Sequence, residues 1–170
     1  MEMLECEAET KDCEMELEAR LVAMLEKRGM TITTAESCTG GLIAGTIVNV
    51  AGASDVLNEG YVTYSNEAKQ RLVGVRAETL EQFGAVSEQT AREMAQGAAK
   101  AANANVALSA TGIAGPGGGS VEKPVGLVYI GCCVDGMTRV EECRFSGTRR
   151  ENREQTVEEA LKLAIEMLDA

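Results

Sequence analysis

The chain has 170 residues, 45% of them hydrophobic, with a formal net charge of −11 and no histidine. That length and apolar content suit a single soluble domain with a sizeable core. The negative charge argues against binding to nucleic acids or anionic membranes. The absence of histidine excludes a Ser-His-Asp triad, a Cys-His dyad and any metal site that needs an imidazole. An activated serine must therefore use another base, and lysine is the usual substitute.

The charge is concentrated near the N-terminus, because residues 1–20 hold eight acidic and two basic side chains, a net of −6. We interpret 1–12 as an acidic N-terminal extension and 13–170 as one domain. The extension lacks the basic and apolar regions of a signal peptide. The longest apolar stretch, 126–134, falls far short of the ~18 residues of a membrane span. The six cysteines show no C-x-x-C spacing, so we expect reduced thiols in a cytoplasmic protein, without zinc or disulfides.

Hydrophobic periodicity and turn residues predict alternating helices and strands along the chain. The predicted helices are 13–28, 42–50, a short one carrying Lys69, a short one ending at Phe83, one from Ser87 to 102, and one after 148. The predicted strands are 30–35, 60–64, 105–110, 125–134 and 137–145. The last two flank Asp135-Gly136, a strong hairpin signal. This order implies a three-layer α/β/α sandwich with a mixed, mostly parallel sheet of about five strands and a C-terminal hairpin.

The segment from Thr33 to Gly41 reads Thr-Thr-Ala-Glu-Ser-Cys-Thr-Gly-Gly and ends a predicted strand. Strand, polar hinge and helix in this order are how α/β enzymes present a nucleophile. Ser37 would lie at the hinge, and the N–H groups that open the next helix would suit an oxyanion or a phosphate. The pattern also fits a plain helix cap, because serine and threonine dominate that position.

Two more polar loops follow predicted strands, and such carboxyl-end loops converge on one crevice in an open α/β sheet. One carries Tyr64 and Lys69, and the other opens with Thr111 and Gly112 and continues as a Gly-rich segment to Ser120. The competing interpretations are an exposed helix lysine and a plain turn. The density of glycine favours a backbone that lies close to a ligand.

Three arginines, Arg149, Arg150 and Arg153, crowd the start of the last predicted helix, which opens with the capping box Thr148-x-x-Glu151. The helix dipole disfavours cations at this end. Neutralisation by nearby glutamates is the simpler explanation. The alternative is an arginine cluster that holds a phosphate monoester.

Five segments occur in order along the chain: Thr34-Ala-Glu-Ser-Cys-Thr-Gly-Gly41, Gly60-Tyr-Val-Thr-Tyr-Ser-Asn-Glu-Ala-Lys69, Gly84-Ala-Val-Ser87, Thr111-Gly-Ile-Ala-Gly-Pro-Gly-Gly-Gly-Ser120 and Lys123-Pro-Val-Gly126. Together they resemble the CinA C-terminal domain family of nicotinamide mononucleotide deamidases, over about residues 13–168. The resemblance implies hydrolysis of nicotinamide mononucleotide to nicotinic acid mononucleotide and ammonia, in pyridine nucleotide salvage. It also implies that no metal and no cofactor take part.

The resemblance implies that Ser37 is the nucleophile, Lys69 the base and Tyr64 a proton-relaying or positioning hydroxyl. The substrate-binding residues expected with them are Glu36, Cys38, Gly40, Gly41, Thr111, Gly112, Gly115, Arg149 and Arg153. The Gly-Asp-Arg that precedes the last helix in the family is Gly-Thr-Arg149 here, so of the arginines only Arg149 and Arg153 carry over.

Other interpretations remain open at this point. Cys38 also lies at a helix start, which lowers a thiol pKa, and is a competing nucleophile. The same loops would equally serve a nucleotide-binding or recruitment module without turnover. We further expect a homo-oligomer, in the first instance a dimer. The nucleotide pyrophosphatase domain of longer CinA proteins is not expected in a chain of this length.

Overall fold

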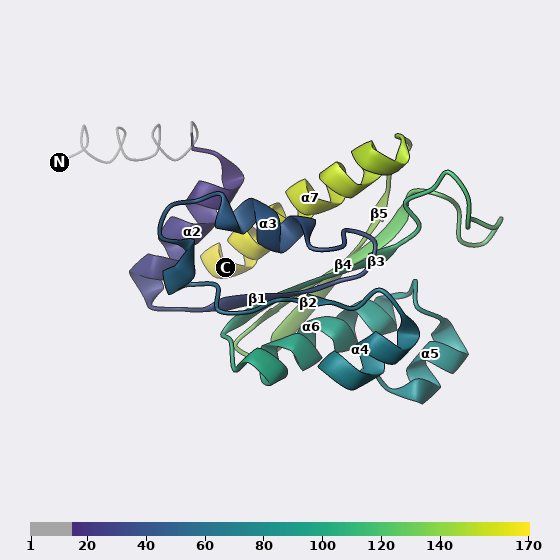
Figure 1. Ribbon diagram of the computed structural model, residues 1–170, viewed down its shortest axis with the longest axis horizontal. Coiled ribbons are helices and arrows are strands. Elements are labelled where there is room, and N and C mark those ends of the chain that lie inside the picture. The colour runs from purple at the N-terminus through teal and green to yellow at the C-terminus, as the bar shows by residue number, and fades with distance from the viewer. Residues whose placement is uncertain (1–14) are drawn as a thin grey trace.

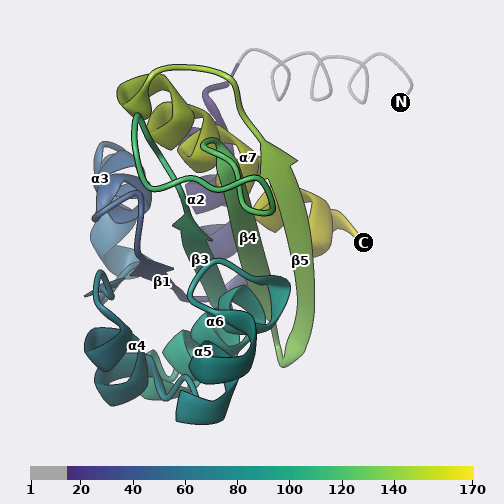
Figure 2. The same cartoon turned by 90° about the vertical axis from the view of Figure 1, so that its right-hand side faces the viewer.

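The computed structural model describes residues 15–170. The predicted extension 1–12 and the first two residues of the predicted first helix lie outside that range. The described chain forms one open five-stranded sheet between two layers of helices (Figure 1, Figure 2). The predicted three-layer α/β/α sandwich is therefore confirmed.

The helices are α2 (Leu17–Arg28), α3 (Leu42–Val48), α4 (Asn66–Val73), α5 (Ala77–Phe83), α6 (Glu88–Ala102) and α7 (Arg149–Asp169), with a 3₁₀ turn η1 (Ala53–Asp55). The strands are β1 (Ile32–Glu36), β2 (Tyr61–Val62), β3 (Val106–Gly112), β4 (Leu127–Val134) and β5 (Met137–Arg144). No helix within 15–170 is both long and apolar enough to cross a membrane.

The strand order across the sheet is β2-β1-β3-β4-β5. β1 pairs in parallel with β2 and β3, whereas β4 runs antiparallel to both β3 and β5. It follows that β4 is the one described strand that points the other way. The sheet is mixed and mostly parallel in strand direction, as the sequence predicts.

The connections that follow β1 and β2 cross to opposite faces of the sheet. In Figure 1, α2, α3 and α7 lie on one face and α4, α5 and α6 on the other. The chain leaves β1 through α3 on the first face and returns from β2 to β3 through α4 to α6 on the second. The carboxyl end of β1 is thus a topological switch point, where open α/β sheets bind ligands.

Local sequence signals explain most element boundaries. Ser87 and Thr148 accept hydrogen bonds from backbone N–H groups at the starts of α6 and α7, and Thr148 completes the predicted capping box with Glu151. The first strand begins two residues later than predicted, at Ile32, because the N–H of Met30 still closes the end of α2 on Leu25.

Helix α6 lies unusually close to the end of α4. A Cβ built on Gly97 would lie 1.6 Å from the backbone carbonyl oxygen of Val73, so only glycine fits there. Gly45, on the exposed face of α3, is a suitable control position for Gly97, because a Cβ added there would meet nothing within 4 Å.

We predict that Gly97→Ala destabilises the protein by about 1–3 kcal/mol or more, because the helices must separate to admit the methyl group. Gly45→Ala should instead stabilise it by up to about 1 kcal/mol, because alanine is the better helix former. Urea unfolding of both variants measures the difference. Equal stabilities of the two variants would contradict the packing described here.

Candidate active site

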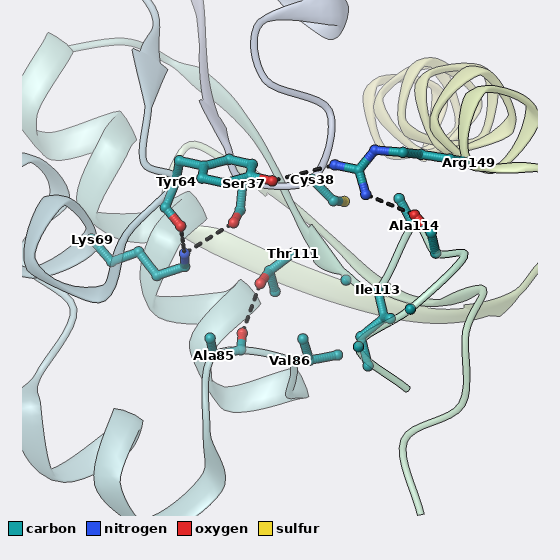
Figure 3. Close-up of a pocket in the computed structure, with 14 residues that line it drawn as sticks. Ser37, Cys38, Tyr64, Lys69, Ala85, Val86, Thr111, Ile113, Ala114 and Arg149 are labelled. Atoms are coloured by element: carbon teal, nitrogen blue, oxygen red, sulfur yellow. Dashed lines mark hydrogen bonds between the residues drawn. The ribbon is translucent and has the colours of Figure 1, made fainter. Parts of the chain in front are cut away.

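A cavity of about 280 Å³ lies at the carboxyl ends of the parallel strands (Figure 3). Its size is at the small end of the range for ligand pockets, which suits a small metabolite. It is lined by Ser37, Cys38, Tyr64, Lys69, Ala85, Val86, Thr111, Gly112, Ile113, Ala114, Gly115, Gly117, Gly118 and Arg149. The three loops predicted to converge do meet here.

Ser37 and Lys69 are in direct contact inside the cavity. The Lys69 Nζ lies 3.0 Å from the Ser37 Oγ, 2.8 Å from the carbonyl oxygen of Thr63 and 3.4 Å from that of Tyr64. A neutral amine can donate to the two carbonyls and keep its lone pair for the serine hydroxyl. The arrangement therefore has the geometry of a base beside a nucleophile.

Lys69 has an environment that favours its neutral form. It extends from α4 into the interior and is only 1% exposed. Burial lowers the pKa of its ammonium from 10.5 to about 8, and no carboxylate opposes that shift. At that pKa about a tenth of the lysine is neutral at pH 7, against well under a thousandth for an exposed lysine.

In the turn after Ser37, only some backbone N–H groups find an oxygen acceptor. The N–H of Gly40 donates to the carbonyl of Ser37 at 3.2 Å, and the N–H of Gly41 donates to Glu36 at 3.1 Å. Within residues 15–170 no oxygen acceptor takes the N–H of Cys38 or Thr39. Of these two residues only Cys38 lines the cavity, because Thr39 is fully buried, so the N–H of Cys38 is the donor that this turn offers to an oxyanion.

Glu36 has a structural task instead of the substrate contact we expected. It is fully buried, and its carboxylate accepts the N–H groups of Gly41, Ile43 and Ala44 at 2.9–3.1 Å. Those are the donors that open α3, and a carboxylate satisfies them while complementing the helix dipole. The start of α3 is consequently closed to a substrate anion.

Cys38 lines the cavity, but its thiol is poorly suited to attack. Figure 3 shows the side chain directed away from Lys69. Burial raises the pKa of this thiol to about 11, so it stays protonated at neutral pH. The geometry thus favours Ser37 over the competing Cys38 nucleophile.

The Gly-rich loop forms the wall opposite Ser37. The Thr111 hydroxyl donates to the carbonyl of Ala85 at 2.7 Å and so joins β3 to the loop before α6. Gly112 admits no side chain, because a Cβ would lie 2.7 Å from the carbonyl oxygen of Leu127. The carbonyl of Gly115 accepts a hydrogen bond from Arg149 at 2.8 Å.

Tyr64 and Arg149 lie at the mouth of the cavity. The Arg149 Nη2 donates to the Tyr64 hydroxyl at 3.3 Å, and the tyrosine is 63% exposed. In the described part of the chain no hydrogen bond joins that hydroxyl to Ser37 or to the amine of Lys69. The Tyr64 hydroxyl contacts Arg149 instead, and this contact suits a positioning role better than a proton relay.

The residues that line the cavity differ in part from those predicted from the sequence. Gly40, Gly41, Glu36 and Arg153 do not line the cavity. No sequence signal marks the apolar wall made by Val86 and Ile113, although both lie in segments that carry the family resemblance. The carbonyl of Thr63 was equally unpredictable, because a backbone acceptor leaves no residue-type signal.

The stability of the protein should depend on Lys69 in a defined pH range. A lysine whose pKa falls from 10.5 unfolded to about 8 folded binds fewer protons than the unfolded chain between these values. Folding stability attributable to this group therefore rises from pH 8 to pH 10.5, by about 3 kcal/mol in total.

We predict that the difference in unfolding free energy between the wild type and Lys69→Met is constant below pH 8. It should then shift by about 3 kcal/mol in favour of the wild type by pH 10.5. Urea unfolding across pH 7–10.5 measures the shift, with Lys100→Met on the exposed end of α6 as the control. A difference independent of pH would contradict the lowered pKa.

The chain matches the family model described as the CinA C-terminal domain over residues 14–168. A putative competence-damage inducible protein of Clostridium perfringens is 55% identical over 144 residues, 85% of this chain and 35% of that protein. A CinA-like protein of Kosmotoga olearia is 56% identical over 148 residues, 87% of this chain and 36% of that protein. The chain spans about a third of the length of these relatives.

Solved structures share the same fold. The competence/damage inducible protein CihA from Agrobacterium tumefaciens aligns with a TM-score of 0.88 and 48% identity, covering 91% of this chain and 94% of that one. A CinA superfamily protein from Escherichia coli aligns with a TM-score of 0.84 and 33% identity, covering 88% of both chains. With the family model matched over almost the whole described domain, this chain belongs to the CinA C-terminal domain family.

Proposed function

We propose that this protein is an amidohydrolase that converts nicotinamide mononucleotide to nicotinic acid mononucleotide and ammonia. The observation that carries the proposal is the 3.0 Å contact between the buried Lys69 amine and the Ser37 hydroxyl. A lysine kept partly neutral beside a serine is an arrangement for nucleophilic attack on a carbonyl. The substrate assignment draws on the motif resemblance to nicotinamide mononucleotide deamidases.

In the first step, Ser37 Oγ bonds to the carboxamide carbon while its proton passes to the Lys69 amine. The carbonyl oxygen becomes an oxyanion, which the N–H of Cys38 would stabilise. The C–N bond then breaks, and the Lys69 proton leaves with the amine as ammonia. Water attacks the resulting ester and passes one proton through Lys69 to the departing Ser37 oxygen, which restores the serine hydroxyl; the carboxylic acid that is released loses its remaining proton to solvent.

The rest of the cavity accommodates the remainder of the substrate. Val86 and Ile113 supply apolar surface for the pyridine ring. Arg149 lies at the rim, where it donates to Gly115 and Tyr64 but has no carboxylate within 4.0 Å among residues 15–170, so its charge is left for the phosphate.

We predict that Ser37→Ala lowers ammonia release from nicotinamide mononucleotide by about 10³-fold or more, whereas Cys38→Ala retains most of the rate. The assay quantifies ammonia in the presence of a chelator, because the proposed chemistry needs no metal ion. Full activity of Ser37→Ala with loss in Cys38→Ala would overturn the assignment. Binding of the mononucleotide to the wild type without ammonia release would favour a recruitment module.

We predict that kcat/KM rises about tenfold per pH unit below pH 8 and levels off above it. The reason is that the base must be neutral, and its pKa in the folded protein is about 8. Measurement between pH 7 and 9.5 avoids titration of the substrate phosphate, whose second pKa is about 6. Lys69→Arg should be nearly inactive throughout, because arginine does not release its proton. A profile that is flat across this range would exclude Lys69 as the base.

A further inference from the structure

Arg153 makes contacts that a substrate-phosphate ligand would not need. It lies in the second turn of α7, does not line the cavity and reaches instead to the turn after Ser37. Its Nε donates to the carbonyl of Cys38 at 2.9 Å, and its Nη2 donates to the carbonyl of Thr39 at 2.8 Å. One guanidinium thus holds two successive carbonyls of the nucleophile turn.

Holding those carbonyls also fixes the amide groups of the same peptides. In a trans peptide the C=O and N–H point in opposite directions. With the Cys38 carbonyl directed at Arg153, the N–H of Thr39 is directed away from α7. The Gly40 N–H fixes the Ser37 carbonyl, and with it the N–H of Cys38, in the same manner.

The three arginines at the start of α7 therefore differ in their surroundings. Arg149 lines the cavity and contacts Tyr64. Arg150 is 86% exposed on its side chain and pairs with Glu154 at 2.7 Å. Arg153 is half-buried, and in the described chain no carboxylate lies within 4.0 Å of it, so its hydrogen bonds go to the Ser37 turn.

We propose that Arg153 is a positioning residue that holds the turn after Ser37, and with it the cavity-lining N–H of Cys38, in place for the oxyanion, and that it does not bind the substrate phosphate. The inference rests on Ser37 acting as the nucleophile of the proposed function. Arginine suits the task because its rigid fork presents two donors to neighbouring acceptors, whereas lysine offers a single flexible ammonium. The Nη2 also lies 3.6 Å from where a Cβ on Gly40 would be, so the guanidinium packs directly against this turn.

The first experiment compares nicotinamide mononucleotide with nicotinamide riboside, which lacks the phosphate. Arg153→Gln should lower kcat by about 10–100-fold on both substrates and leave KM within a few-fold, because only the transition state carries the oxyanion. The preference for the mononucleotide should stay unchanged. Arg149→Ala should shrink that preference, and Arg150→Ala, the matched control on the same helix, should change neither quantity.

A loss confined to the mononucleotide, or seen mainly in its KM, would make Arg153 a phosphate ligand and overturn the inference. Guanidinium ion added to Arg153→Ala should restore part of kcat, which a general loss of structure would not allow. If the glutamine variant does not fold, Arg153→Lys gives the same comparison, because it keeps the charge and loses the fork.

The second experiment does not depend on the proposed substrate. A fluorophosphonate bonds through phosphorus to Ser37 Oγ, with loss of fluoride and transfer of the serine proton to Lys69. Its phosphoryl oxygen would occupy the oxyanion position. Mass spectrometry should find Ser37 labelled at a rate about 10–100-fold lower in Arg153→Gln than in the wild type or in Arg150→Ala.

These outcomes separate the two proposals. Labelling with the expected Arg153 dependence, but no ammonia from the mononucleotide, would reject the substrate and retain the positioning role. Equal labelling rates in the wild type and Arg153→Gln, or no labelling of wild-type Ser37, would overturn the inference.

Discussion

The burial of one lysine amine without a counter-charge is the constraint to which the rest of the site is adapted. Lys69 is a charged residue type held at 1% exposure, and its hydrogen-bond partners are two backbone carbonyls and a serine hydroxyl. An adjacent carboxylate would favour the charged ammonium and raise its pKa toward the ordinary lysine value. The main buried carboxylate nearby, Glu36, is instead turned onto the amide groups that open α3. The carboxylate of Glu36 is thus used to cap α3, and the Lys69 amine lies beside Ser37 without a carboxylate partner.

Side chains of helix α7 form hydrogen bonds to the loops that surround this amine. From its first two turns, Arg149 reaches Gly115, Asn152 reaches the carbonyl of Ala114 at 3.0 Å, and Arg153 reaches the Ser37 turn. Arg149 and Arg153 donate to backbone carbonyls, and Arg150 pairs with Glu154, so each arginine has a partner that offsets the unfavourable helix dipole. Loops usually move more than the elements that they connect, and three side chains from one rigid helix limit that freedom.

Much of this could be predicted from the sequence, for identifiable reasons. Strand and helix order, the hairpin at Asp135-Gly136 and the capping box depend on local patterns, and local patterns are what a sequence displays. The convergence of Ser37, Lys69 and Thr111 followed from the rule that carboxyl-end loops meet at a switch point. The tasks of Glu36 and Arg153 could not be predicted, because each depends on which backbone groups a buried side chain meets, and residue type does not encode that. The arginine cluster indicated an anion, whereas Arg153 is satisfied by carbonyl dipoles.

Helix α7 is the last element of the chain, so the side chains that complete the site are synthesised last. Every strand and every loop of the cavity precedes residue 149, yet the side chains that hold those loops belong to the helix that follows. A ribosome-bound chain that has completed β5 already contains Ser37 and Lys69. It still lacks the α7 side chains that hold the loops around them. It also leaves uncovered the apolar sheet face on which α7 packs, with Val157, Leu161 and Ile165 still to come. The site is therefore complete only after α7 has packed on the sheet, and until then the half-made molecule exposes apolar surface of the kind that chaperones bind.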